Sequence, residues 1–170
     1  MKKIIIIAAG LIGFTVSANA QATATATASA TIVTPITINK DVDMNFGNVA
    51  VSALNAGTVV MTPGGVRSAT LGVTLPAVAG SPTAASFTVS GESGYTYAIT
   101  LPTTPLTITS GSNTMTVDNF ISNPSGTGIL SVGATASQTL QVGATLNVAA
   151  GQASGTYTST TPFPVTVNYN

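Results

Sequence analysis

The chain has 170 residues, of which 5% are charged, and it contains no His, Cys or Trp. Without imidazole and thiol groups, Ser-His-Asp and Cys-His catalysis and zinc sites built on those ligands are excluded. Lys and Arg number 4 against 4 acidic residues, so no basic patch is present to neutralise the phosphates of a nucleic acid.

The first 20 residues have the features of a secretory signal peptide. Lys2 and Lys3 precede an apolar run over residues 4–16, and residues 17–20 read Ser-Ala-Asn-Ala, a small-residue cleavage site. An apolar run of about 13 residues is too short to cross the ~30 Å hydrocarbon core of a bilayer. We therefore expect cleavage after Ala20 and export to the periplasm, the cell surface or the medium, with no transmembrane segment in the mature chain.

Residues 21–34 form an N-terminal segment of biased composition. Residues 22–31 read ATATATASAT, so Ala alternates with Thr or Ser at the period of two that a β-strand has. Four roles are open: the first strand of the chain's own domain, a donor strand for a neighbouring copy, a mobile stalk, or a steric zipper. The apolar positions of this candidate strand-pairing segment are Ala22, Ala24, Ala26, Ala28, Ala30, Ile32 and Val33.

Residues 35–170 are predicted to form one all-β domain. Short apolar runs at a period of two are separated by Gly, Pro, Ser and Asn about every 8–12 residues, and no apolar stripe has helical spacing. One apolar face per run is typical of two antiparallel sheets packed as a β-sandwich. The expected strands contain residues 44–47, 59–61, 70–75, 87–89, 95–101, 115–117, 140–142 and 146–148, with a last strand that begins only at Val165 because Pro162 and Pro164 precede it.

The acidic residues are the remaining candidates for a site. Asp41 and Asp43 are two residues apart and are expected to share a strand face, where their oxygens could bind Ca²⁺ weakly. The neighbouring Lys40 favours a solvated strand entrance instead. Glu92 and the Asp118-Asn119 segment are interpreted as polar turns. We assign no catalytic residue, no metal ligand beyond these weak candidates and no cofactor, and we expect no enzymatic activity.

The tyrosines are the candidate platforms for a glycan, because stacking on a sugar needs a flat aromatic ring. Tyr95 and Tyr97 are expected on the core face of one strand, and Tyr169 on the last. Tyr157 follows a turn and is also interpreted as a packing residue. A glycan is therefore a possible ligand without positive support from the sequence.

Several segments resemble those of a known family of secreted bacterial proteins. They are residues 36–38 leading to Met44-Asn45-Phe46-Gly47, then residues 85–91, 113–117 and 142–148. From about Ala22 to Asn170 the chain resembles the domain-of-unknown-function 4402 family, and residues 155–158 and 165–169 are more distantly similar to spore coat U and fimbrial-type domains. The resemblance implies a Gram-negative source and an immunoglobulin-like or pilin-like β-sandwich with Greek-key type connections. It implies no activity and no functional residues.

Two classes of function agree with these features. The first is a secreted structural or surface protein, in the manner of a fimbria-like subunit, whose partners in β-strand addition are copies of itself or another surface subunit. The second is a monomeric extracellular adhesin or glycan-binding module. The scarcity of aromatic residues counts against the second class, although the same fold can support either one.

Overall fold

The computed structural model describes residues 21–133 and 136–170. Residues Val33–Asn170 form one compact unit, and residues 21–32, the N-terminal extension, belong to another. The predicted signal peptide, residues 1–20, lies outside the described residues. Within the described part of the chain no helix is long and apolar enough to cross a membrane.

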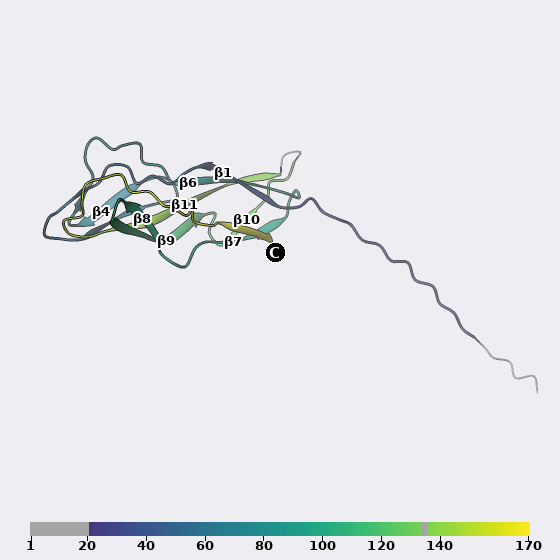
Figure 1. Cartoon of the computed structure of the whole chain (residues 1–170). Helices are drawn as coiled ribbons and strands as arrows, with labels where there is room; N and C mark the ends of the chain where they lie inside the picture. The colour runs from purple at the N-terminus through teal and green to yellow at the C-terminus, as the bar shows by residue number, and fades with distance from the viewer. Residues whose placement is uncertain (1–20, 134–135) are drawn as a thin grey trace, which may run out of the picture. The chain divides into compact units, whose positions relative to one another are not determined.

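The described residues contain twelve β-strands and no helix (Figure 1). The strands are β1 (Thr37–Val42), β2 (Ala50–Val51), β3 (Gly57–Met61), β4 (Arg67–Leu71), β5 (Val73–Thr74), β6 (Ala85–Ser90), β7 (Thr96–Thr100), β8 (Leu106–Ser110), β9 (Asn113–Asn123), β10 (Thr127–Ile129), β11 (Ser137–Val148) and β12 (Thr166–Tyr169). All pairs are antiparallel, which confirms the predicted all-β class.

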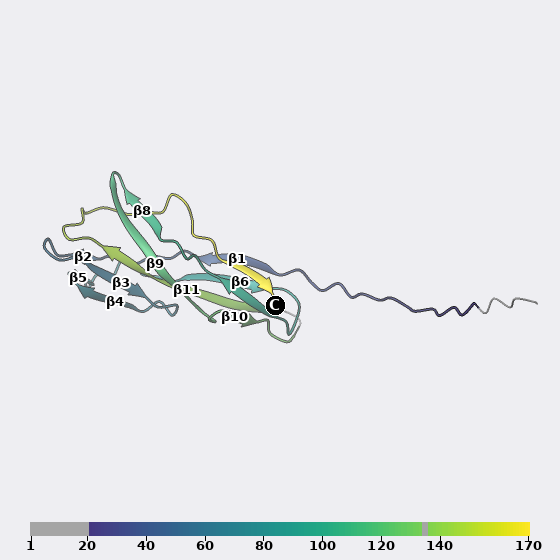
Figure 2. The ribbon, with the colours of Figure 1, turned by 90° about the horizontal axis from the view of Figure 1, so that it is seen from below.

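The long strand β11 connects the two halves of the main sheet (Figure 2). Its first half, residues 137–142, pairs with β6, and its second half, residues 144–148, pairs with β3. Since β9 pairs with residues 141–147 and overlaps both, β9 must occupy the opposite edge, so β6 and β3 lie end to end along one edge. The sheet continues from β6 to β1, from β3 to β4 and from β9 to β8.

Gly143 lies in β11 at the junction between its two halves. A Cβ at this position would overlap the carbonyl oxygen of Met61 and would lie 2.6 Å from the carbonyl carbon of Thr62 and 2.8 Å from the nitrogen of Pro63. Only glycine therefore allows the chain leaving β3 to pass this close to β11.

Two apolar clusters lie side by side along β11. The first is formed where β6 and the first half of β11 face the three-stranded sheet β10-β7-β12, and it contains Phe87, Tyr97, Leu140 and Val167. The second is formed by β3, β5, β9 and the second half of β11. Its buried members are Val59, Val73, Val117, Ala144, Leu146 and Val148. Packing of two antiparallel layers through the first cluster confirms the predicted β-sandwich.

Several predicted strands differ from those observed. Residues 44–47 form only an isolated bridge, between Asn45 and Thr83. The expected strand at residues 70–75 is broken after Leu71, whose φ of 53° is incompatible with a continuing strand. The last strand begins at Thr166, one residue later than expected. Residues 140–142 and 146–148, expected as two strands, are parts of the continuous strand β11.

The structure also disagrees with one of the four roles predicted for the N-terminal segment, that of a first strand. Residues 21–36 form no strand, and β1 begins only at Thr37, so the structure does not show this segment as the first strand of its own domain. Every residue from 21 to 32 is exposed, and Ile32 is 96% exposed. Val33 is partly buried and belongs to the compact unit, so the domain begins two residues earlier than predicted.

Candidate functional site

One concave feature of the domain is a largely apolar groove with a volume of about 1130 Å³. Residues 42–51, from the end of β1 to β2, line one part of it, and residues 152–159, 162 and 163, which follow β11, line another. Strands β8, β9 and β11 supply further lining, and Lys40 of β1, Gly80, and Ala85 and Phe87 of β6 complete it. From β8, β9 and β11 the groove receives Leu106, Ile108, Met115, Val117, Leu146 and Val148, of which the first three are only partly buried.

The segment that follows β11 has few backbone partners. Among the described residues, Thr158 alone in the stretch 153–165 makes backbone–backbone hydrogen bonds, and both join Thr109 of β8. Figure 2 shows this segment returning along the domain before it enters β12. An extended segment with unpaired N–H and C=O groups can pair with a further strand.

Tyr157 fixes the start of this segment. Its hydroxyl donates to the carbonyl oxygen of Ala153 at 2.8 Å and accepts from the side-chain amide of Gln152 at 2.8 Å. The same amide donates to the carbonyl oxygen of Thr114 in β9 at 3.1 Å. Tyr157 is partly buried and its hydroxyl both donates and accepts a hydrogen bond, which agrees with the predicted packing role.

Arg67 holds the opposite part of the groove, residues 42–51. Its guanidinium donates to the carbonyl oxygens of Phe46 and, at 3.1 Å, Asn48. Between these residues Gly47 has a φ of 67°, and a Cβ there would overlap the carbonyl oxygen of Ala79. A charged donor is therefore used to hold a loop backbone in place.

The two weak Ca²⁺ candidates, Asp41 and Asp43, have different hydrogen-bond partners. A register shift between Lys40 and Val42 interrupts the two-residue periodicity, and β1 ends before Asp43, so Asp41 and Asp43 do not share a regular strand face as predicted. The carboxylate of Asp41 accepts from the hydroxyl of Thr88 at 2.8 Å. Within the described residues no group of three or more His, Cys, Asp or Glu side chains could hold a metal ion.

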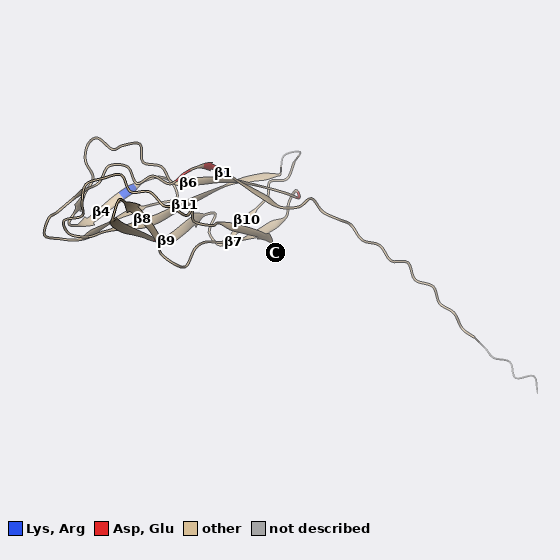
Figure 3. Cartoon of the chain, in the orientation of Figure 1, with Lys and Arg blue, Asp and Glu red and all other residues tan. Residues whose placement is uncertain are grey.

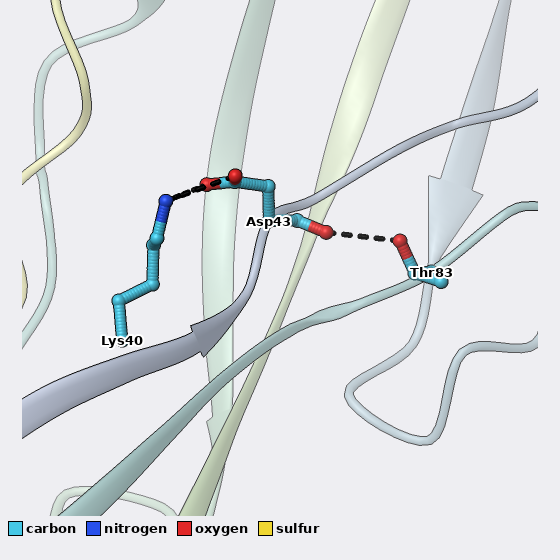
Figure 4. Close-up of polar contacts among 3 residues, drawn as sticks. All are labelled: Lys40, Asp43 and Thr83. Atoms are coloured by element: carbon cyan, nitrogen blue, oxygen red, sulfur yellow. Dashed lines mark hydrogen bonds and ion pairs between the residues drawn. The ribbon is translucent and has the colours of Figure 1, made fainter.

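Asp43 instead pairs with Lys40 at one end of the groove (Figure 4). The ammonium group lies 2.7 Å and 2.9 Å from the two carboxylate oxygens. The backbone carbonyl of Asp43 accepts from the hydroxyl of Thr83 at 2.9 Å, which ties the chain after β1 to the segment before β6. Both charges are exposed, so the pair adds little stability.

A second polar feature holds the beginning of the domain: the N-terminal clamp formed by Thr34, Glu92 and Tyr169. The Glu92 carboxylate accepts from the backbone N–H of Thr34 at 2.8 Å. The Tyr169 hydroxyl donates to the Thr34 carbonyl oxygen at 2.7 Å and accepts from the backbone N–H of Glu92. The hydrogen bond from Thr34 lowers the pKa of Glu92 below its usual value, because it stabilises the charged form.

The clamp was not foreseen from the sequence, in which Glu92 is interpreted as turn polarity and Tyr169 as a core residue. Its members are 58 and 135 positions from Thr34, and no local motif connects them. Asp118 also differs from its interpretation as a turn residue. It lies inside β9 next to a register shift, and its carboxylate accepts from the side chain of Asn119 at 3.1 Å.

The remaining tyrosines do not share one flat platform. Tyr97 is fully buried, and its hydroxyl donates to Gln138 at 2.8 Å; burial raises the pKa of Tyr97. Tyr95, expected on the same core face, precedes β7 and is 44% exposed. It packs edge-on against Tyr169, with ring centroids 5.6 Å apart. Tyr97 thus packs in the core, whereas Tyr95 packs at its exposed edge.

The N-terminal extension carries most of the candidate strand-pairing positions. Ala22, Ala24, Ala26, Ala28, Ala30 and Ile32 are all exposed and lie outside any strand. Charged residues are absent from residues 21–32, and few charged positions are visible on the ribbon of the domain (Figure 3). Val33 lies beside the clamped Thr34, so the extension leaves the compact unit directly before the N-terminal clamp.

The sequence profile of a family described as Domain of unknown function (DUF4402) matches residues 36–169. The matched range covers all twelve strands of the sandwich. No curated protein and no solved structure shows a significant match to the chain.

Proposed function

The chain belongs to the DUF4402 family, whose function is not assigned, and from its own residues we propose that it is an exported structural subunit that joins other copies by β-strand addition. In this mode an extended segment of one molecule adds a strand to a sheet of another, and main-chain hydrogen bonds supply much of the affinity. The signal-peptide features of residues 1–20 support export. No catalytic residue is part of the proposal.

The observation that carries the proposal is the N-terminal extension. It has the alternation of a strand over residues 22–31, yet the described structure shows no strand there and every side chain from 21 to 32 is exposed. A strand is stable only when its N–H and C=O groups find a partner strand. A second copy would supply that partner, and the absence of charge on the extension removes repulsion between copies.

The proposal is tested by removing the extension and leaving the clamp in place. Residues 21–170 and residues 33–170 are compared by light scattering and electron microscopy over a range of concentrations. Assembly is expected to grow with concentration for residues 21–170 and to be absent for residues 33–170. A matched control replaces residues 21–32 by a Gly/Ser sequence of equal length, which keeps the reach of the segment but lowers its β-propensity.

The outcome separates the two classes of function. If residues 21–170 remain monomeric at every concentration, the structural-subunit proposal is wrong. If that monomer also binds members of a glycan panel, the adhesin hypothesis takes its place.

A further inference from the structure

We propose that the apolar groove is the acceptor for the N-terminal extension, residues 21–32, of a second copy of this chain. The inference rests on the proposed β-strand addition, and it specifies the surface at which the strand is added. Three observations on the domain and on the extension carry it: their chemistry, their backbone pairing and the exposure of the extension.

The groove and the extension agree in chemistry and in length. Partly buried apolar side chains such as Ile108 and Met115 line the groove, and among the described residues the only charged ones in its lining are the mutually paired Lys40 and Asp43. The extension is uncharged, with Ala at alternate positions and Ile32 as its one large apolar side chain. The two bordering segments, residues 42–51 and 152–163, are similar in length to residues 21–32.

Backbone pairing favours a strand as the occupant over a compact ligand. Along residues 153–165 the described structure has backbone–backbone hydrogen bonds only at Thr158. Apart from the Ala153 carbonyl, which accepts from the Tyr157 hydroxyl, and the missing N–H groups of Pro162 and Pro164, the remaining main-chain groups of this border are open to a strand laid beside them. A small apolar molecule could fill the groove but would leave these groups without partners.

The exposure of the extension favours a second copy over the same molecule. Every residue from 21 to 32 is exposed in the described structure, and none of them belongs to the lining of the groove. Along β11 the groove extends from Phe87, which pairs with Leu140, to Val148, so it begins about 10 Å from the clamp and continues away from it, at 3.3–3.4 Å per residue. Because the extension and the groove are different surfaces, a contact between copies is head-to-tail and repeats as an open chain.

Cross-linking with introduced cysteines tests this contact, because the native chain contains no Cys. One preparation of residues 21–170 carries Ala28→Cys in the extension. A second preparation, with a mass tag, carries either Ser154→Cys in the groove lining or Ser68→Cys on β4; both serines are exposed, and Ser68 is outside the groove lining. After oxidation, the mixture with Ser154→Cys is expected to contain at least about tenfold more tagged heterodimer than the mixture with Ser68→Cys. Docking of the extension raises the effective concentration of the first thiol pair only.

A charged substitution in the groove gives a second, independent readout. Ile108→Glu places a carboxylate in the groove lining, and Thr107→Glu places one on the exposed side of the same strand, β8. Assembly of residues 21–170 is expected to fall at least about tenfold with Ile108→Glu and to be unchanged with Thr107→Glu, since an unpaired charge is costly in an apolar contact. If circular dichroism shows that Ile108→Glu unfolds the domain, the cysteine experiment decides.

The possible results distinguish this inference from the proposed function. If copies assemble but Ser68→Cys cross-links as well as Ser154→Cys, the acceptor lies elsewhere and only the groove assignment is wrong. If neither assembly nor cross-linking is detected, both proposals are wrong. A doubly substituted chain that cross-links within itself at every dilution would show that the extension fills its own groove. Uptake of a fatty-acid probe that assembly does not displace would assign the groove to a small apolar ligand instead.

Discussion

At the scale of single residues, two of the charged side chains of the domain, those of Arg67 and Glu92, hold its backbone. Arg67 donates to two loop carbonyl groups, and Glu92 accepts from the N–H of Thr34. Hydrogen bonds that involve an ionised group are about twice as strong as neutral ones. In a chain with 5% charged residues, these two charges thus fix a loop and the start of the domain. Lys40 and Asp43, by contrast, form an exposed ion pair.

The clamp at Thr34 predicts a pH dependence at the start of the domain. Because the folded-state pKa of Glu92 is lowered from 4.5, its contribution is fully present above that value and is lost as the pH falls through the lowered folded pKa. We expect the hydrogen-exchange protection of the Thr34 amide to be constant near neutral pH and to decrease below the unfolded pKa. NMR-detected exchange of residues 21–170, corrected for intrinsic rates, measures this protection.

Glu92→Gln is the matched variant for this prediction. It keeps the shape of the side chain and a carbonyl acceptor but removes the titrating charge. Protection at neutral pH is expected to be lower than in the native chain, and the decrease at acidic pH is expected to disappear. If the variant shows the same acid-dependent decrease as the native chain, another group controls the clamp.

At the scale of elements, β11 shows which features of the fold the sequence could predict and which it could not. Its apolar alternation is regular through Leu140 and Val142, and again through Leu146 and Val148, because each set fills one of the two cores. The sequence pattern predicts two separate strands here, since Gly143 between them resembles a break. The close passage of Met61 that makes this glycine necessary is a contact between distant parts of the chain, which periodicity does not record.

Contacts between distant parts of the chain also explain why the irregular strands, the groove and the N-terminal clamp could not be predicted from the sequence. Residues 44–47 alternate like a strand, but Arg67 binds the carbonyl of Phe46 and the loop is not a sheet edge. The break after Leu71 accompanies Gly72, which lies too close to the carbonyl group of Asn55 for any larger residue. Groove and clamp both depend on such long-range contacts. The sequence could predict the class of fold and the candidate extension, but it could not predict the surface proposed to receive it.

Gly143 gives a prediction at this scale. Gly143→Ala is expected to destabilise the domain by about 1–3 kcal/mol, the range for inserting a methyl group where no space exists. The reason is the overlap of the new Cβ with the Met61 carbonyl and its closeness to Pro63. Urea denaturation of residues 21–170 measures the free energy of unfolding.

Gly64→Ala is the control for this change. A Cβ at Gly64 would have one neighbouring atom, the hydroxyl oxygen of Thr62, at a distance of 3.9 Å, and Gly64 has no positive φ. The free energy of unfolding of this variant is expected to remain within about 0.5 kcal/mol of the native value. Equal effects of the two substitutions would contradict the steric role assigned to Gly143 at the junction between the two halves of β11.

At the scale of the whole molecule, the scarcity of charge is itself a property relevant to assembly. Residues 21–170 carry two positive and four negative side chains, so copies neither repel nor attract each other strongly. Contacts between copies must then come from main-chain hydrogen bonds and from apolar burial. An exposed, unpaired and uncharged strand-like extension is a risk of non-specific association unless a specific acceptor exists. The groove, with its charges already paired, has the properties of such an acceptor.

This balance predicts that assembly depends little on ionic strength. Raising the salt concentration from 0.1 M to 1 M shortens the Debye length from about 10 Å to about 3 Å, which strongly weakens contacts between exposed charges. The extension has no charge and the described lining of the groove has only the pair Lys40–Asp43, so the midpoint concentration of assembly is expected to change by less than about twofold over this range. Light scattering of residues 21–170 measures the midpoint, and the thermal stability of residues 33–170 in the same salt series controls for effects on the fold. A tenfold or larger weakening by salt would show that charged surfaces carry the contact, because strand addition of an uncharged segment offers no such dependence.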